Sequence, residues 1–239
     1  MKKLLYLLSV FIVVASLLSS SAQALTPIGP PVATLERGQL AAGFTYGQAE
    51  GDIKGTVLGF ELVVEDIEVK TYMANLFLGL DDSVELQIDL GGSRYDDVDY
   101  CSSGNFTGGF GVKATLSKQD KLKFGVAFMM HWYEANGSGV TMGIPWTEKD
   151  DWTEIQVAIG PSFEDGPWRL YGGPFLHFID GEAEGTIAGI PVSGDFEEDS
   201  NVGGFAGLQV DLDDNTTLGF EYQQTGSANV FGASIRFRF

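Results

Sequence analysis

The chain has 239 residues and a formal net charge of −19, with 33 acidic against 14 basic side chains. An acidic chain repels the phosphates of nucleic acids, which excludes that class of partner. Hydrophobic residues make up 44% and aromatic residues 12%, which excludes intrinsic disorder, and a single cysteine excludes a domain held together by disulfides.

The first 24 residues have the layout of a secretory signal peptide. A short basic start at residues 1–3 precedes an apolar core, and Ala22-Gln23-Ala24 is a typical cleavage site. Cleavage after Ala24 leaves 215 of the 239 residues, with 12 basic and 33 acidic side chains and a net charge of −21. A retained membrane anchor is the alternative, but the segment lacks the length and flanks of a transmembrane helix.

Residues 25–35 form a Pro-rich N-terminal lead-in, and residues 36–239 are expected to form one domain. In this domain apolar residues recur at every second position, over segments of about ten residues. The clearest series is Leu122, Phe124, Val126, Phe128, Met130 and Trp132. Series of this kind occupy, in chain order, residues 40–46, 72–78, 84–90, 106–116, 122–132, 155–159, 168–178, 202–212, 218–222 and 231–239.

The connections between these segments alternate in length. Short polar turns are expected at 81–83, 117–121, 164–167 and 213–216, and longer polar stretches at 48–66, 93–104, 135–151 and 180–200. Short turns on one side and long loops on the other are typical of outer-membrane barrels. The pattern predicts an all-β, antiparallel up-and-down transmembrane β-barrel of ten strands, or of eight if a Gly-rich first or ninth strand is misassigned.

The residues between the apolar positions should face the lumen, which in so narrow a barrel is filled by side chains. Because buried charges survive only when paired, we predict a lumen charge network. Its members are Glu85, Asp89, Lys113, Lys123, Glu154, Arg169, Asp211, Glu221, Arg236 and Arg238. A soluble β-sandwich would alternate too, but aromatic residues at the predicted strand ends favour a membrane girdle: Tyr72, Trp132, Trp152, Trp168, Tyr222 and Phe239.

The last ten residues, 230–239, resemble the C-terminal targeting strand of outer-membrane β-barrel proteins. The family pattern is a glycine, alternating hydrophobic residues and a terminal aromatic residue, matched here by Gly232, Ile235, Phe237 and Phe239. Val230 departs from this pattern, because the family usually has a polar residue there. The resemblance to small porin-like barrels implies a place in the outer membrane of a Gram-negative envelope, among lipid and lipopolysaccharide. It also implies insertion by the barrel-assembly machinery.

Candidate chemistry is sparse. The two histidines, His131 and His177, should lie at about the same height in the lumen, with Glu154 on the strand between them. Such a row could hold a metal or act as a general acid–base pair, although a hydrogen-bond network in which Glu154 orients both rings is the simpler interpretation. We predict no catalytic residue and no cofactor.

Acidic clusters raise the question of calcium. Residues 211–215 begin like a calcium loop, but Thr216 and Tyr222 replace the glycine and the final glutamate, so a tight turn is predicted. Six further carboxylates are expected in outer loops as a solvated face, with bridging of divalent ions to lipopolysaccharide as the alternative: Asp96, Asp97, Asp99, Glu197, Glu198 and Asp199.

The sequence therefore predicts a non-enzymatic outer-membrane barrel with a structural, surface-presenting or narrow-pore role. One alternative is a barrel enzyme or metal-binding barrel that uses His131, Glu154 and His177. A second alternative is a surface adhesin or receptor that acts through its acidic outer loops.

Overall fold

The computed structural model describes residues 26–57, 60–97, 100–101, 105–141, 144–197, 202–226 and 228–239. The predicted signal peptide, residues 1–24, lies outside the described residues, as do Asp99, Glu198 and Asp199 of the predicted acidic loops. Within the described part of the chain, no helix is long and apolar enough to cross a membrane.

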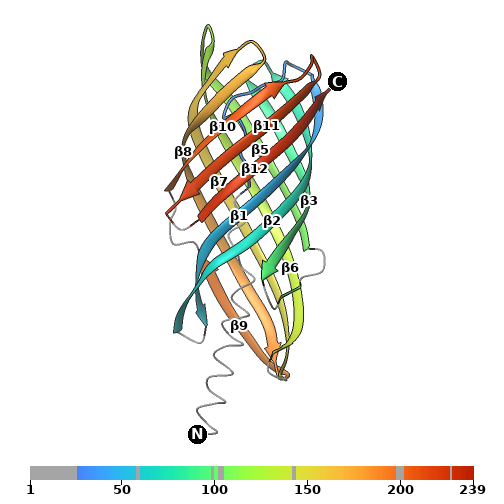
Figure 1. Cartoon of the computed structure of the whole chain (residues 1–239), viewed down its shortest axis with the longest axis vertical. Helices are drawn as coiled ribbons and strands as arrows, with labels where there is room; N and C mark the ends of the chain where they lie inside the picture. Colours follow the sequence, from blue (N-terminus) through green and yellow to red (C-terminus); the bar gives the residue numbers. More distant parts are fainter. Residues whose placement is uncertain are drawn as a thin grey trace.

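Nearly all of the described chain is β-strand (Figure 1). The strands are β1 (Leu40–Val57), β2 (Phe60–Asp81), β3 (Val84–Asp97), β4 (Tyr100–Cys101), β5 (Asn105–Gln119), β6 (Leu122–Thr141), β7 (Ile144–Asp165), β8 (Trp168–Ile187), β9 (Ile190–Glu197), β10 (Val202–Asp211), β11 (Thr216–Thr225) and β12 (Ala228–Arg238). β9 and β10 pair with successive parts of β8 and so share one position in the wall. β4 is a two-residue strand that pairs with β3 outside the main order.

The wall is a closed ring. Its order is β10-β11-β12-β1-β2-β3-β5-β6-β7-β8, and the pairing of β8 with β10 completes it. The first and last strands pair from Ala41–Arg238 to Gly51–Ala228. All of these pairs are antiparallel, which confirms the predicted up-and-down barrel of ten strands.

The short connections are turns held by their own side chains. Asp81 accepts a hydrogen bond from the Ser83 amide at 2.6 Å. Asp213 accepts from the amides of Asn215 and Thr216 at 2.8 and 2.7 Å. Aspartate favours turns because its carboxylate can take a backbone amide two or three residues on. The segment 211–216 is thus a tight turn, as predicted, and its first carboxylates are engaged within the protein.

An apolar band surrounds the barrel. The outward positions are those that the alternation predicts, and large apolar side chains along them are exposed: Leu40, Phe44, Leu76, Ile88, Leu90, Phe110, Phe124, Ile159, Leu170, Leu176, Phe220, Phe231 and Phe237. A continuous exposed surface of this size is not tolerated in water. It is the surface that a membrane barrel presents to lipid.

The prediction that Trp152 belongs to the girdle is wrong. Trp152 is 4% exposed and faces inward, where its ring stacks on Tyr133 with centroids 4.8 Å apart and planes 5° apart. The other five girdle residues, Tyr72, Trp132, Trp168, Tyr222 and Phe239, are exposed. Trp152 has the same strand parity as the inward Glu154, so the alternation contradicted its assignment to the girdle.

The prediction of long outer loops is also wrong, because most residues of those segments belong to strands. β6 and β7 pair as far as Thr141–Ile144, and β8 and β9 pair as far as Ile187–Ile190. Alternation continues there with the faces reversed: Ala135, Trp146, Trp152, Ala183 and Ile187 are buried, and Glu134, Lys149, Asp151, Glu182 and Glu184 are exposed. The outer surface faces water there. We call residues 133–141, 144–151 and 180–195 the outer extension; it forms the lower end of the barrel in Figure 1.

Candidate functional site

The N-terminal segment of the described chain lies inside the barrel. Residues 26–35, which we call the plug, run through the lumen before the chain turns into β1. Ile28, Val32, Ala33 and Leu35 are at most 4% exposed. The sequence identified this segment as a Pro-rich lead-in but did not place it, because it has no periodicity and its contacts lie far away in the chain.

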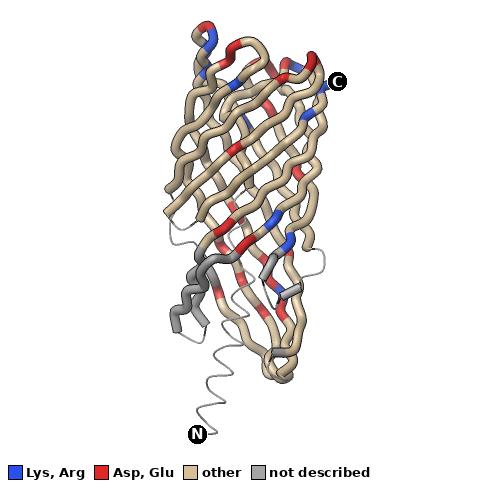
Figure 2. Tube along the Cα trace, viewed as in Figure 1, with Lys and Arg blue, Asp and Glu red and all other residues tan. Residues whose placement is uncertain are grey.

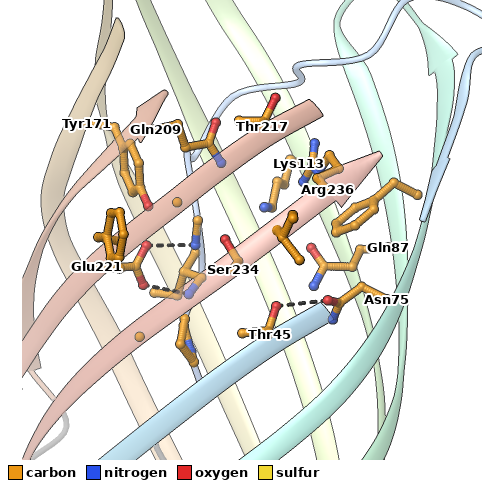
Figure 3. A pocket seen from close by; sticks show the side chains of 18 residues that line it. Thr45, Asn75, Gln87, Lys113, Tyr171, Gln209, Thr217, Glu221, Ser234 and Arg236 are labelled. Carbon is orange, nitrogen blue, oxygen red and sulfur yellow. Dashed lines mark hydrogen bonds between the residues drawn. The ribbon is translucent and has the colours of Figure 1, made fainter. Parts of the chain in front are cut away.

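Glu221 of β11 holds the middle of the plug. Its two carboxylate oxygens accept hydrogen bonds from the backbone amides of Ile28 and Gly29, at 2.7 and 2.8 Å (Figure 3). Gln223 donates a further bond of 2.7 Å to the same carboxylate. A buried carboxylate is stable only when its lone pairs are satisfied, and here backbone amides of the plug supply that need.

Two other lumen carboxylates bind the ends of the plug. Glu85 accepts from the amides of Thr34 and Leu35 at 2.8 and 3.2 Å, and from the Thr34 hydroxyl at 2.8 Å. Glu154 accepts from the amide and hydroxyl of Thr26 at 3.2 and 3.0 Å. Glu85, Glu154 and Glu221 were predicted as members of a charge network. In the structure all three accept hydrogen bonds from backbone amides of the plug.

Glycines on the inner wall leave room for the plug. A Cβ at Gly232 of β12 would lie 2.3 Å from Pro27 Cγ, and one at Gly125 of β6 would lie 2.4 Å from the Pro31 carbonyl oxygen. Both distances are too short for any side chain. Gly232, predicted as part of the assembly signal, thus has a packing role in the lumen as well.

The predicted row of His131, Glu154 and His177 is brought together in the lumen. His177 Nε2 lies 3.0 Å from Glu154 Oε1, and His131 Nδ1 lies 3.7 Å from Glu154 Oε2. On its other side, His131 Nε2 lies 3.0 Å from Asp89 Oδ2. The row is therefore Asp89–His131–Glu154–His177, with every side chain fully buried. Asp89 was predicted to face the lumen, but sequence spacing alone did not pair it with His131.

Glu154 has its acceptor capacity occupied. Besides Thr26 and His177, the Tyr133 hydroxyl donates to it at 2.7 Å and Gln156 donates at 2.7 Å. A catalytic or metal-binding carboxylate needs an open position for substrate or ion. Among the residues that the structure describes, no three His, Cys, Asp or Glu side chains form a group that could hold a metal.

A second buried group lies nearer the turn end. Arg236 Nη1 is 3.3 Å from Glu85 Oε1, and the guanidinium lies 3.6 Å over the ring of Phe77. Lys113, 2% exposed, stands opposite Glu85 in the β3–β5 register. These cations line a cavity of about 40 Å³ together with Gln87 and Ser234 (Figure 3). That volume accommodates about one or two water molecules and no larger ligand.

The remaining predicted lumen charges form ion pairs at the rim beside the short turns. Glu164 bridges Lys123 and Arg169, at 2.8 Å from each, and Arg238 Nη2 lies 2.7 Å from Asp211 Oδ1. These side chains are partly exposed. Glu164 belongs to a predicted turn and was not among the predicted network residues.

Backbone amides of Asn215 and Thr216 hold the pKa of the neighbouring Asp213 below its usual value.

The predicted assembly signal occupies the strand that closes the barrel. Phe237 and Phe239 point outward, and the Phe239 amide donates a 2.9 Å hydrogen bond to the Leu40 carbonyl at the start of β1. Ile235, on the same outward face, pairs with Phe44. The C-terminal residue thus lies at the seam between the last strand and the first.

Two solved structures share the fold at low identity. The outer membrane protease OmpT from Escherichia coli aligns with a TM-score of 0.54 and 9% identity, over 84% of this chain and 97% of that one. The translocator domain of the autotransporter NalP from Neisseria meningitidis aligns with a TM-score of 0.53 and 12% identity, over 86% and 90%. At such identity the likeness concerns the fold alone. None of the curated proteins matches the sequence.

The family profile described as "Outer membrane protein beta-barrel domain" matches residues 11–239, nearly the whole chain. The closed ten-strand wall, the apolar band and the short turns at one end agree with that match. The chain therefore belongs to the outer membrane protein beta-barrel domain family and is a protein of the outer membrane.

Proposed function

We propose that the protein is a closed, non-enzymatic barrel that anchors the outer extension at the surface of the outer membrane. The observation that carries this proposal is the plug, which occupies the lumen with residues 26–35. A narrow pore needs a continuous path of water through the lumen. In this barrel the plug occupies the lumen, and its side chains Ile28, Val32 and Leu35 are buried there.

The hydrogen bonding of the plug supports a permanently closed state. Glu154, Glu221 and Glu85 bind its backbone in succession from residue 26 to residue 35. Hydrogen bonds to charged groups contribute about 1.5–3 kcal/mol each, and releasing the plug would leave buried carboxylates without partners. The same network supports a non-enzymatic role, because the acceptor positions of Glu154 are occupied and the Nε2 atoms of His131 and His177 are hydrogen-bonded within it.

The surface-presenting part of the proposal rests on the outer extension. Its outward face carries Glu134, Asp151, Glu182 and Asp195 in one cross-strand row from β6 to β9. Four carboxylates in one row favour, as a second candidate function, an adhesin or receptor for a basic partner. Two results together would support this candidate: the wild-type protein binds polylysine less tightly as salt is raised, and a variant with all four carboxylates changed to Gln or Asn loses that binding. Unchanged binding would contradict it.

Planar-bilayer recording tests the closed barrel. We expect the wild-type protein to insert without steady conductance. We expect a variant that lacks residues 26–35, with the signal peptide and cleavage site retained, to conduct. A variant that shortens both hairpins of the outer extension is the control and should stay silent. Steady conductance by the wild-type protein would refute the closed-barrel proposal, and a silent deletion variant with a folded barrel would show that the plug is not the barrier.

A further inference from the structure

Lys113 of β5 is a buried cation without a direct partner in the lumen network. Its side chain points inward, opposite Glu85 in the β3–β5 register, and is 2% exposed. Within the part of the chain that the structure describes, its Nζ atom makes no hydrogen bond, and no carboxylate oxygen lies within 4.0 Å of it. An ammonium group has three donors and no acceptor, so burying it without a counter-charge is costly.

The lumen carboxylates around Lys113 have other partners. Glu85 accepts hydrogen bonds from the plug through Oε2, and its Oε1 lies 3.3 Å from Arg236 Nη1. Both oxygens of Glu221 accept hydrogen bonds from plug amides. Asp89 is hydrogen-bonded to the side chains of its neighbours on β2, β3 and β6. The positive charge of Arg236 is therefore balanced by Glu85, and the ammonium of Lys113 lacks an anion at contact distance.

The Lys113 ammonium faces a small cavity. Lys113 and Arg236 both line this cavity of about 40 Å³, and residues 27–29 of the plug form one of its walls (Figure 3). The ammonium lies against that wall, because a Cβ on Gly29 would be 2.9 Å from Lys113 Nζ. Ser234 lines the same cavity and adds a hydroxyl donor. Two buried cations and a hydroxyl around one enclosed space form a donor set for an anion.

We propose that this cavity binds one chloride ion in contact with the Lys113 ammonium. The size of the cavity excludes phosphate, sulfate and carboxylate ligands, whereas a chloride ion is only slightly larger than a water molecule. Its single negative charge equals the charge that Lys113 leaves unbalanced. Gln87 Oε1, which also lacks a hydrogen bond among the described residues, is an acceptor for one water molecule beside the ion. The site uses the plug as a wall, but it does not depend on the barrel being non-conducting.

Bromide in place of chloride tests the site directly, because bromide has nearly the same size and scatters X-rays anomalously. Crystals of the wild-type protein grown in sodium bromide should show an anomalous peak in the cavity, in contact with Lys113 Nζ. Crystals of Lys113→Gln grown in the same way should show no peak there. A wild-type cavity that holds only water would overturn the proposal, and so would a peak of equal height in Lys113→Gln.

The stability of the barrel gives a second test in solution. An ion that binds only the folded state raises the unfolding temperature in proportion to the logarithm of its concentration, once that exceeds the dissociation constant. We expect the temperature at which the folded band disappears in a heat-modifiability gel to rise with sodium chloride or bromide. Sodium gluconate at the same ionic strength should not raise it, because gluconate is too large for the cavity.

Two variants separate the site from general salt effects. Lys113→Gln should lose the chloride dependence, and Lys123→Gln, which removes a partly exposed cation at the rim, should keep it. An equal effect of chloride and gluconate on the wild-type protein would mean charge screening and would overturn the proposal. Chloride dependence that remains in Lys113→Gln would overturn it as well. If Lys113→Gln does not fold, the bromide peak and the comparison of salts in the wild-type protein still decide.

Discussion

Individual carboxylates in the lumen bind partners from distant parts of the chain. Glu154 is hydrogen-bonded to residues 21, 23 and 128 positions away, and it connects Tyr133, His177 and Thr26. The inward direction of Glu154 follows from its place between Ile155 and Thr153 in a strand of period two. Its partners cannot be read in this way, because alternation fixes only the face, and ring closure decides which strands meet.

Replacing Glu154 by glutamine tests the strength of this network. The substitution keeps the shape of the side chain but removes the charge, so His177, Tyr133 and Thr26 lose a charge-assisted acceptor. We expect the barrel to lose about 2–4 kcal/mol of stability. The temperature at which the folded band disappears in a heat-modifiability gel measures this. Glu182→Gln, on the exposed face of β8, is the control and should leave that temperature unchanged.

Asp213 makes turn stability depend on pH. Its folded-state pKa is lowered by the amides of Asn215 and Thr216 from the ordinary value of 3.8. Because the folded pKa is depressed, the stabilising contribution is complete above the unfolded-state pKa and disappears as pH falls through the folded value. We expect Asp213→Asn to lower the urea midpoint at pH 7, and we expect the difference from wild type to shrink as pH falls below 3.8. Asp214→Asn, the adjacent control, should show a smaller difference at pH 7.

At the scale of elements, the wall strands were predictable and the plug was not. Residues 122–132 show an apolar face because lipid contacts every second position, and that local cause leaves a local pattern. The plug, with sequence Thr-Pro-Ile-Gly-Pro-Pro-Val-Ala-Thr-Leu at 26–35, is buried on all sides and has no alternation. One signal was present: inward glycines such as Gly232 lie where an inner wall needs space for something else.

The contact between β12 and the plug gives a direct test of plug packing. A methyl group at Gly232 would lie 2.3 Å from Pro27 Cγ and 2.8 Å from its Cβ, so Gly232→Ala should displace the plug. Overpacking of this kind costs about 1–3 kcal/mol. We expect the variant to show intermittent conductance, and the second change Pro27→Gly to silence it again. Gly204→Ala, where the nearest atom would be 4.0 Å away, is the control. Conductance that persists in the double variant would contradict this packing.

The outer extension was predicted as loops because apolar residues were expected on the outward face alone. Above the membrane the outside is water, so the polar and apolar faces exchange while the period stays two. Trp152 shows the consequence, since it packs on Tyr133 in the interior.

This reversal predicts unequal effects for two tryptophans that the sequence placed together in the girdle. Trp152→Ala removes a buried ring and should cost about 3 kcal/mol or more. Trp132→Ala removes a ring that is 40% exposed and should cost less. The thermal midpoints of the two variants, measured in the same detergent, test this order, and equal midpoints would contradict the inward packing of Trp152.

For the whole molecule, charge is distributed along the barrel axis. Arg37, Lys118, Lys121 and Lys123 lie near the short turns together with carboxylates such as Asp82 and Asp120, and both colours appear at that end of the barrel in Figure 2. In the outer extension carboxylates outnumber basic residues. The net charge of −19 follows from the composition alone. Where the charges lie along the barrel follows only once the direction of each strand is known. An acidic outer end disfavours close contact with anionic glycolipid.

Phe239 tests how the whole barrel is assembled. It is 81% exposed at the end of the wall, so it contributes little packing, and its amide bond to Leu40 does not depend on its side chain. An acidic side chain near the membrane interface costs only about 0–1 kcal/mol. Phe239→Asp should therefore unfold at nearly the wild-type temperature once refolded in detergent. If the assembly machinery reads this residue, the same variant should be strongly depleted from outer membranes in cells. Equal loss in both settings would mean that Phe239 acts through stability, and wild-type levels in cells would contradict a targeting role. Only depletion in cells with normal stability in detergent assigns the terminal aromatic residue to assembly.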